Sequence, residues 1–122
     1  GLAGTDYPWG HEAPSCTLGA QNGAQYGLCL PDDTVPVASF ASNGYGLFDM
    51  AGNVWEWVSD WYDADYYSSS PPENPTGPVS GSGRTLRGGS WHLENPLRLP
   101  NRVSYNPGET DCNIGFRCSL SP

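Results

Sequence analysis

The densest run of hydrophobic residues in the chain is GLFDMAGNVWEWVSDWY, at 46–62. From Val54 to Val58, apolar and polar positions alternate imperfectly, which favours a strand but also allows a helical turn. The turn signal NGYG (43–46) comes directly before this run. We therefore expect a turn followed by a strand in this part of the chain.

Three other segments predict strands. RTLRGGSW (84–91) and IGFRCSL (114–120) both have strand patterns, and the second is expected to be the last strand. VPVASF (35–40) is a short candidate that we expect at a sheet edge, because Pro36 cannot donate a ladder hydrogen bond. The sequence shows no internal repeat and no pattern of a long helix.

The remaining segments have neither periodicity. Residues 1–35 are punctuated by Gly, Pro, Asn and Asp and predict loops with short turns. Residues 63–83 have the composition of a surface loop, and the strong segments on both sides favour an internal loop over a linker. Residues 92–113 favour a solvated loop by composition, although their Tyr, Ser, Asn and Thr side chains also suit a contact surface.

Composition places the chain among small folded domains. Its 122 residues suffice for one core, and 5 Trp, 7 Tyr and 3 Phe argue against disorder despite 16 Gly and 12 Pro. The net charge is −8, and all five basic residues are arginine, so we expect no nucleic-acid partner and no anionic membrane surface. No apolar run is long enough for a membrane span.

Four cysteines stand at 16, 29, 112 and 118. None forms a CxxC pair, so a zinc site is not expected. A Cys16–Cys29 disulfide would close a short loop in an oxidising compartment, but spacing alone leaves the bridged and free forms open. The N-terminus has no signal-peptide pattern, and the chain can be the mature form of a secreted protein or a piece of a longer one.

Two acids flank a turn-prone dipeptide in DMAGNVWE (49–56). Asp49 and Glu56 lie seven residues apart with Gly52 and Asn53 between them. Calcium prefers carboxylates mixed with backbone carbonyls, which a tight turn can direct inward. The alternative is two solvated acids around a turn, and spacing alone favours it, since the pattern is not an EF-hand.

The tryptophans and histidines offer little chemistry by themselves. We expect Trp55, Trp57 and Trp61 in the core, whereas Trp91 is as well suited to a binding surface. His92 follows Ser90 by two residues, but GGSW is not a nucleophile elbow, so a Ser90–His92 catalytic pair is disfavoured.

Four motifs resemble the sulfatase-modifying-factor family, the domain of formylglycine-generating enzymes. They are YPWG (7–10), NGYGLFDMAGNVWEWVSDWY (43–62), NPTGPVSGSGRTLRGGSW (74–91) and NIGFRC (113–118), in the family's order and over almost the whole chain. The resemblance implies an α+β, loop-rich, C-type-lectin-like fold with a small twisted antiparallel sheet. It covers only the C-terminal portion of the family's fold, so we expect residues 1–122 to form one domain that lacks the N-terminal helical part and can need a partner segment.

The resemblance also implies particular roles for residues. The Asp49 and Glu56 side chains and the Gly52 and Val54 carbonyls match a structural calcium site. Ser90 and Trp55 match the lining of the enzyme's groove.

One departure from the family concerns its chemistry. The enzyme carries two copper-binding cysteines just after its GGS motif, whereas here HLENP (92–96) follows Trp91 and the next cysteine is Cys112. Because Cu(I) prefers thiolates, we expect neither copper nor formylglycine synthesis.

Part of the family displays variable ligand-binding surfaces, as variable proteins of diversity-generating retroelements. Their variable segment runs from an RGGSW-like start through LRxxNR and a proline to IGFR, and this chain has RGGSW, LRLPNR (97–102), Pro107 and NIGFR in that order. Most side chains of the segment are encoded by codons reachable from AAC by replacing adenines, although Glu94 and Glu109 are not. The expected ligand-binding residues are Trp91, His92, Leu93, Glu94, Asn95, Leu99, Asn101, Val103, Ser104, Tyr105, Asn106, Thr110, Asp111 and Asn113.

The sequence therefore predicts a non-catalytic ligand-binding module whose residues 91–113 contact a protein or another surface ligand. An extracellular, cell-surface or virion-associated location fits this role. Two alternatives stay open: an iron-dependent oxidase of the wider family using His11, His92 and Glu94, and an accessory domain of a larger, kinase-like or surface protein.

Overall fold

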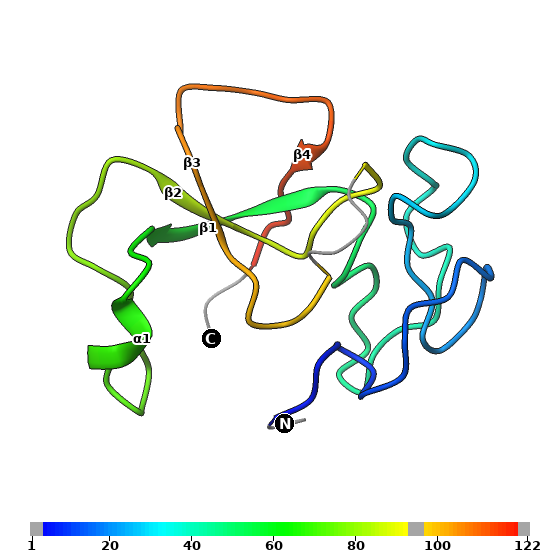
Figure 1. Cartoon of the computed structure of the whole chain (residues 1–122), viewed down its shortest axis with the longest axis horizontal. Coiled ribbons are helices and arrows are strands. Elements are labelled where there is room, and N and C mark those ends of the chain that lie inside the picture. Colours follow the sequence, from blue (N-terminus) through cyan, green and yellow to red (C-terminus); the bar gives the residue numbers. More distant parts are fainter. Residues whose placement is uncertain (1–3, 93–96, 120–122) are drawn as a thin grey trace.

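A four-stranded sheet carries the second half of the chain (Figure 1). The computed structural model describes residues 4–92 and 97–119. The strand order is β3-β2-β1-β4, where β1 and β2 are antiparallel, β2 and β3 are antiparallel, and β1 and β4 are parallel. A single-turn helix, α1, follows β1. The bounds are Trp55–Trp61 for β1, Tyr66–Ser69 for α1, Arg84–Arg87 for β2, Val103–Tyr105 for β3 and Ile114–Gly115 for β4.

The sheet is mixed, so the expectation of a wholly antiparallel sheet was wrong in one pairing. The strands expected near 54–58, 84–91 and 114–120 are confirmed, although β2 and β4 are shorter than predicted. β2 ends at Arg87 because Gly88 and Gly89 take φ values of 92° and 78°, which a strand cannot continue. The edge strand β3 was not predicted and lies inside the segment that showed no periodicity.

The strand expected at 35–40 is absent, and that prediction was wrong. Ala38 has a φ of 62°, and its N–H donates to Asp49 Oδ2 at 2.7 Å instead of to a ladder. The Asp49 side chain therefore takes the place of a strand partner for Ala38. The turn at 43–46 is confirmed by the hydrogen bond from Gly46 N–H to the Asn43 carbonyl, 2.9 Å.

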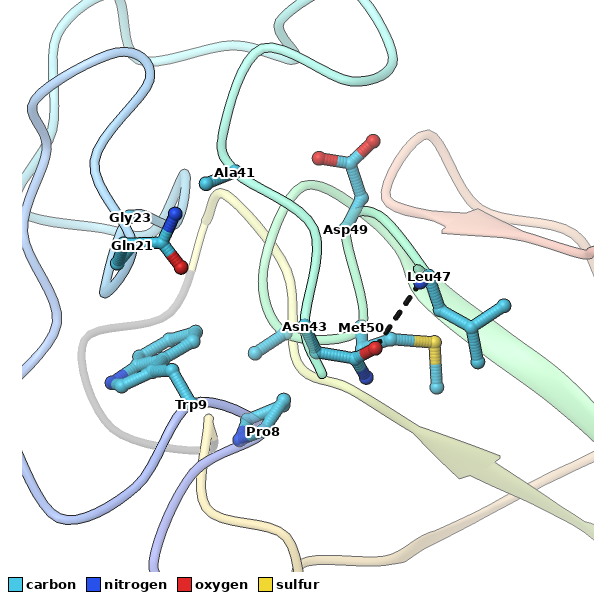
Figure 2. A pocket seen from close by; sticks show the side chains of 10 residues that line it. Pro8, Trp9, Gln21, Gly23, Ala41, Asn43, Leu47, Asp49 and Met50 are labelled. Atoms are coloured by element: carbon cyan, nitrogen blue, oxygen red, sulfur yellow. Dashed lines mark hydrogen bonds between the residues drawn. The ribbon is translucent and has the colours of Figure 1, made fainter. Parts of the chain in front are cut away.

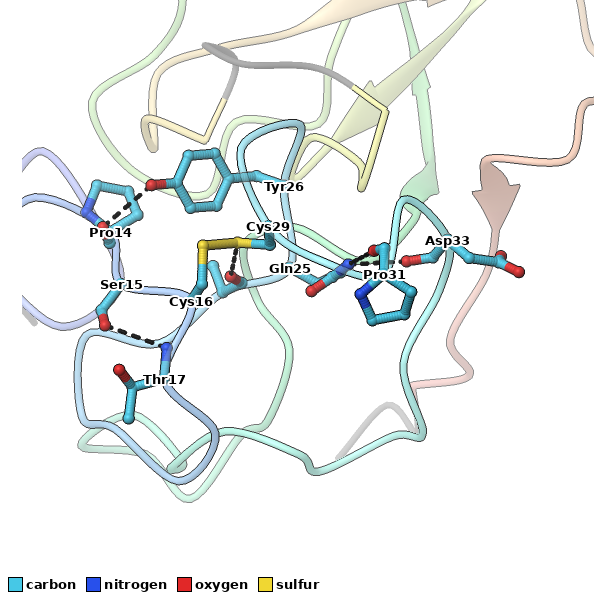
Figure 3. Close-up of a disulfide and its surroundings, with 10 residues drawn as sticks. Pro14, Ser15, Cys16, Thr17, Gln25, Tyr26, Cys29, Pro31 and Asp33 are labelled. Atoms are coloured by element: carbon cyan, nitrogen blue, oxygen red, sulfur yellow. Dashed lines mark hydrogen bonds between the residues drawn. A yellow bond between two sulfur atoms is a disulfide. The ribbon is translucent and has the colours of Figure 1, made fainter.

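Residues 4–50 form the irregular half of the molecule, as their composition predicted (Figure 1). A Cys16–Cys29 disulfide ties this coil together, which decides between the two forms that the spacing left open (Figure 3). Beside it, the buried Gln25 donates from Nε2 to the carbonyls of Pro31 and Asp33, at 2.6 and 2.9 Å. The coil thus satisfies its polar groups through backbone turns and side-chain hydrogen bonds rather than through a sheet.

The core is small and lies between the coil and the sheet. Ala24, Ala51 and Leu97 are buried together, and Tyr7, Trp9 and Tyr26 pack against them. Trp55 is 4% exposed, as predicted for a core residue, whereas Trp57 and Trp61 are only half-buried. The described residues include no helix that is long and apolar enough to cross a membrane.

Gly52 and Asn53 join the two halves. Asn53 is 8% exposed, and its side chain bonds both the N–H and the carbonyl of Val35, at 3.1 and 3.2 Å. Its backbone N–H reaches the Gln25 carbonyl at 2.7 Å, and its carbonyl accepts the Trp91 N–H at 2.8 Å. Both residues have positive φ, 79° and 65°, a region that Gly and Asn tolerate best. The dipeptide therefore fixes the coil against the start of the predicted binding segment.

Substitutions at three glycines distinguish steric overlap from backbone conformation as the reason why the junction requires glycine at position 52. A Cβ on Gly52 would lie 2.3 Å from the Gln25 carbonyl oxygen, Gly19 has a φ of +76° with open space around it, and Gly44 has neither constraint. We expect Gly52→Ala to lower the free energy of unfolding by about 2–4 kcal/mol, Gly19→Ala by about 1 kcal/mol and Gly44→Ala by less than about 0.5 kcal/mol. Urea unfolding measures all three, and equal losses for Gly52→Ala and Gly44→Ala would contradict the assigned role of the junction.

Candidate functional site

The predicted binding segment is anchored at both ends in buried structure. At its start, the Trp91 N–H is held by the Asn53 carbonyl, and Ser90 beside it is fully buried. At its end, the Asn113 carbonyl accepts the Trp55 N–H at 2.8 Å, and Asn113 Nδ2 donates to Ser90 Oγ at 3.4 Å. The two ends therefore meet beside the first residues of β1.

Between these anchors, the β3–β4 loop (106–113) bonds mainly to itself. Asn106 Oδ1 accepts the Gly108 N–H at 3.0 Å, and the Asn106 carbonyl accepts the Glu109 N–H at 3.0 Å. Asp111 Oδ1 accepts the Cys112 N–H at 2.7 Å. Residues 106–112 are all exposed, so the loop stands out from the sheet while its backbone is held by local bonds.

Two predicted residues, Tyr105 and Asp111, are in direct contact, and two others, Trp91 and His92, contact each other. Tyr105 packs edge-on against Trp57, with ring centroids 5.9 Å apart, and its hydroxyl donates to Asp111 Oδ2 at 3.4 Å. Hydrogen bonds from the Cys112 side chain and N–H lower the pKa of Asp111, with smaller contributions from the Tyr105 hydroxyl and the charge of His92. His92 itself is edge-on to Trp91 at 5.2 Å.

Other predicted residues lie elsewhere or cannot be placed. Leu99 belongs to a different contact, because its N–H donates to the Asp6 carbonyl at 2.8 Å, and the Asn101 carbonyl faces Arg87. Val103, Ser104 and Thr110 are exposed on β3 and on the loop that follows it. The predictions for Leu93, Glu94 and Asn95 fall outside the described residues.

The two arginines of LRLPNR differ in role. Arg98 pairs with Asp6 Oδ1 at 2.8 Å and so ties the segment to an acid. Arg102 instead donates to the backbone carbonyls of Asp63 and Ala64, at 3.0 and 3.3 Å. Its guanidinium also lies over the rings of Tyr62 and Tyr67, so Arg102 ties the segment to the chain around α1.

A hollow of about 450 Å³ is lined by all four residues matched to the calcium site, Asp49, Gly52, Val54 and Glu56. Asp49 Oδ1 is buried without a hydrogen-bond partner, an arrangement that leaves a carboxylate oxygen unsatisfied. Figure 2 shows this carboxylate directed away from Asn43 and Met50. The neighbouring hollow at Trp9 in the same figure has about 10 Å³, room for one water at most.

Arg117 completes this site and was missed by the sequence reasoning. Its guanidinium holds both carboxylate oxygens of Glu56, one at 2.6 Å from Nε, and donates to the carbonyls of Phe48 and Asp49 at 3.0 Å each. The only signal was one arginine in GFRC, with nothing to indicate its partner. Within the described residues no three His, Cys, Asp or Glu side chains come together, so a cation here depends on carbonyl and water oxygens as well.

The donor set still suits calcium. It offers two carboxylates, one with a free buried oxygen, and a carboxylate already bound by arginine retains lone pairs for a metal. Backbone carbonyls and water can supply the remaining ligands that a hard cation requires. The residues present therefore fit the implied metal, with Arg117 as an added neighbour.

The arrangement of the two histidines bears on catalysis. His92 is exposed while Ser90 is fully buried, and Ser90 Oγ is bonded to Asn113, so the pair does not form a nucleophile and base. His11 Nδ1 lies 3.0 Å from Asp6 Oδ2, in the contact between the coil and Arg98.

Comparison with known proteins identifies the family. The family model described as the sulfatase-modifying factor enzyme 1-like domain matches residues 1–121. The formylglycine-generating enzyme of Streptomyces coelicolor is 41% identical over 133 residues, which cover 98% of this chain and 41% of the enzyme. The chain therefore belongs to the sulfatase-modifying-factor family, as its motifs predicted.

Two further proteins are similar. The solved structure of Treponema denticola variable protein 1 matches with a TM-score of 0.71 and 37% identity, over 93% of this chain and 40% of that chain. The serine/threonine-protein kinase pkn1 of Chlamydia pneumoniae is 50% identical over 90 residues, covering 71% of this chain and 14% of the kinase. The expected loop-rich, C-type-lectin-like α+β fold is thus confirmed, and the chain spans less than half the length of these relatives.

The exposed loop supplies a test of its local electrostatics. A hydrogen bond and the negative charge of Asp111, together with desolvation, raise the pKa of the exposed Cys112 thiol. Asp111→Asn should lower this pKa, and because the thiolate is the nucleophile, alkylation of Cys112 near about pH 8 should become several-fold faster. Peptide mass spectrometry after iodoacetamide treatment measures the rate, with Cys118 in the same molecule as the control. Unchanged rates at both thiols would contradict the Asp111–Cys112 contact.

Proposed function

We propose that this member of the sulfatase-modifying-factor family is a non-catalytic ligand-binding module that presents residues 91–113 as a variable surface. One observation carries the proposal: the exposed side chains of the β3–β4 loop are held by local bonds, while the anchors at Trp91 and Asn113 are fixed in buried structure. Side chains can therefore change between the anchors without changing the frame.

The similarity to Treponema denticola variable protein 1 supports this role. The frame motifs RGGSW and NIGFR stand at the two ends of the surface, where the structure has its anchors. Tyr105 and Asp111 are hydrogen-bonded to each other and offer a phenol and a carboxylate, which suit a polar contact with a protein or another surface ligand.

The cysteines support the absence of formylglycine synthesis. The resemblance places two copper-binding thiols directly after the GGS motif, where this chain has HLENP. Cys112 and Cys118 are exposed and follow the surface rather than opening it. The purified chain incubated with copper and a cysteine-containing peptide should yield no aldehyde product, and peptide conversion detected by mass spectrometry would overturn the proposal.

Diversification by a retroelement has a separate genomic test. We expect a reverse-transcriptase gene nearby and an imperfect repeat of the coding region for 87–118 that differs mainly at adenines. A generic ligand-binding domain would lack the repeat.

An accessory role within a larger protein is the second candidate. The similarity to part of the kinase pkn1, of which the match covers 14%, favours it. In this second candidate the chain is one domain of a larger protein, and residues 91–113 contact another part of that protein.

The surface should tolerate substitution far better than the frame. Val103, Ser104 and Thr110 are exposed, so we expect the triple variant with alanine at these positions to lose less than about 1.5 kcal/mol of unfolding free energy. Leu86 is 1% exposed, and Leu86→Ala should cost about 2–5 kcal/mol. Urea unfolding compares the two, and a triple variant as unstable as Leu86→Ala would contradict the separation of surface from frame.

Calcium is proposed as a structural ion held by the Asp49 and Glu56 side chains and by the Gly52 and Val54 carbonyls. At about 100 times its dissociation constant, a bound ion stabilises the folded state by about 2.7 kcal/mol, so calcium should raise the unfolding temperature. Asp49→Asn should abolish the increase, whereas the exposed Glu73→Gln should preserve it. Calorimetry with millimolar calcium or EDTA measures the effect, and an equal response in both variants would exclude this site.

A further inference from the structure

A second concave site lies between the sheet and α1, separate from the β3–β4 loop. It has a volume of about 180 Å³ and is lined by residues of β1, α1, the proline-rich loop after α1, and β2. Val58 and Thr85 contribute from the sheet, and Tyr66 and Tyr67 from α1. The Tyr66 hydroxyl accepts the Gly77 N–H at 3.0 Å and so holds the proline-rich loop beside the helix. Figure 1 shows α1 and this loop at the end of the sheet remote from the N-terminal coil.

Two half-buried arginines, Arg87 and Arg102, line this concavity. The Arg102 guanidinium carbon lies 4.0 Å from the Tyr67 ring centroid and 5.4 Å from that of Tyr62. Within the described residues, the ion pairs shorter than 4.0 Å involve His11, Arg98 and Arg117 but neither of these arginines. Although the chain has 13 Asp and Glu against five Arg, both of these arginines line the site without an ion pair to any described carboxylate.

Contacts within the protein satisfy the guanidinium of Arg102 but only weakly satisfy that of Arg87. Arg102 rests on tyrosine rings and donates to two carbonyls, which satisfies much of its guanidinium. Arg87 donates only from Nη1 within the described residues, to the Tyr67 hydroxyl at 3.3 Å and the Asn101 carbonyl at 3.5 Å, both long for hydrogen bonds. A half-buried cation with such weak partners is better satisfied by an anion in the concavity.

Asp60 restricts the chemical class of ligand that this concave site can bind. It also lines the site, and the Ser59 hydroxyl donates to its Oδ1 at 3.3 Å. A carboxylate repels a simple polyanion but accepts hydrogen bonds from hydroxyl groups. The walls therefore suit a compact molecule with a carboxylate at one end and hydroxyls at the other, and the volume is that of a single sugar-sized ring.

We propose that this site binds a small hydroxylated carboxylate, the chemical class of the uronic acids. The ligand's carboxylate accepts from Arg87 and Arg102, a hydroxyl donates to Asp60, and the tyrosines of α1 pack against its ring. This binding site is separate from the surface proposed above. The lining residue that falls within the range 91–113 is Arg102.

The test uses the 122-residue chain and titrates glucuronate, glucose and inorganic phosphate separately. Heteronuclear NMR follows the Trp61 indole N–H and the Thr85 and Gly77 amides. Glucuronate should give saturable shifts, and glucose, which lacks the carboxylate, should bind at least about tenfold more weakly. Phosphate should also be weaker, because it bears no hydroxylated ring.

Variants then locate the contacts. Arg87→Gln should weaken glucuronate binding roughly tenfold, and Asp60→Asn should reduce the preference for glucuronate over phosphate. Arg98→Gln is the matched control, since this exposed arginine pairs with Asp6 and lies outside the site. Unchanged amide dispersion in each variant shows that the fold is retained.

Several results would overturn the proposal. They are no saturable shift with glucuronate up to about 50 mM, equal binding of glucose or phosphate, and unchanged glucuronate affinity in a folded Arg87→Gln variant. None of them affects the proposed role of the β3–β4 loop, which rests on different residues.

Discussion

The junction made by Gly52 and Asn53 is the constraint on which the rest of the structure depends. The coil of residues 4–50 has no strand or helix of its own and is held internally by turn hydrogen bonds, isolated bridges and a disulfide, so its position on the sheet depends on contacts beyond the coil. Asn53 provides such contacts, because it bonds to Val35 and Gln25 and also accepts the Trp91 N–H. Gly52 permits the close approach because a side chain there would overlap the Gln25 carbonyl. A single left-handed dipeptide thus joins the coil to the sheet.

This arrangement also explains why the end of the chain can be irregular. The start of the binding segment is fixed by Asn53 and its end by Trp55, two residues apart in sequence. The segment is therefore closed like a long hairpin, whatever lies between its ends. Its loop needs only local bonds, such as those of Asn106 and Asp111, to hold a conformation. Freedom of sequence in the loop and rigidity of the frame follow from the same junction.

The sequence predicted the elements whose pattern is local. The apolar run at 46–62 contains β1, and RTLR forms β2, because the two strands pair with each other and bury Trp55, Thr85 and Leu86. VPVASF had a strand's composition but lost its pairing to Asp49, a competitor 11 residues away that no local pattern reveals. β3 was missed for the opposite reason, since VSY is too short for a period and forms an edge strand only because β2 lies beside it. The residues of the hollow at Asp49 were identified by resemblance, whereas Arg117 required the fold, because it reaches Glu56 across 61 residues.

Arg117 links the strand that ends the β3–β4 loop to the hollow proposed to hold calcium. It lies two residues after β4, which directly follows the β3–β4 loop, and its guanidinium holds Glu56 and the Asp49 carbonyl. The pKa of Arg117 is raised chiefly by its hydrogen bond to Glu56, so the guanidinium stays charged and balances an acid pair that is otherwise repulsive. Calcium bound as proposed would share the Glu56 carboxylate and the surroundings of Asp49 with this guanidinium. The proposed ion would therefore act on the strand that ends the loop, which makes it a support for the display surface rather than a participant in ligand contact.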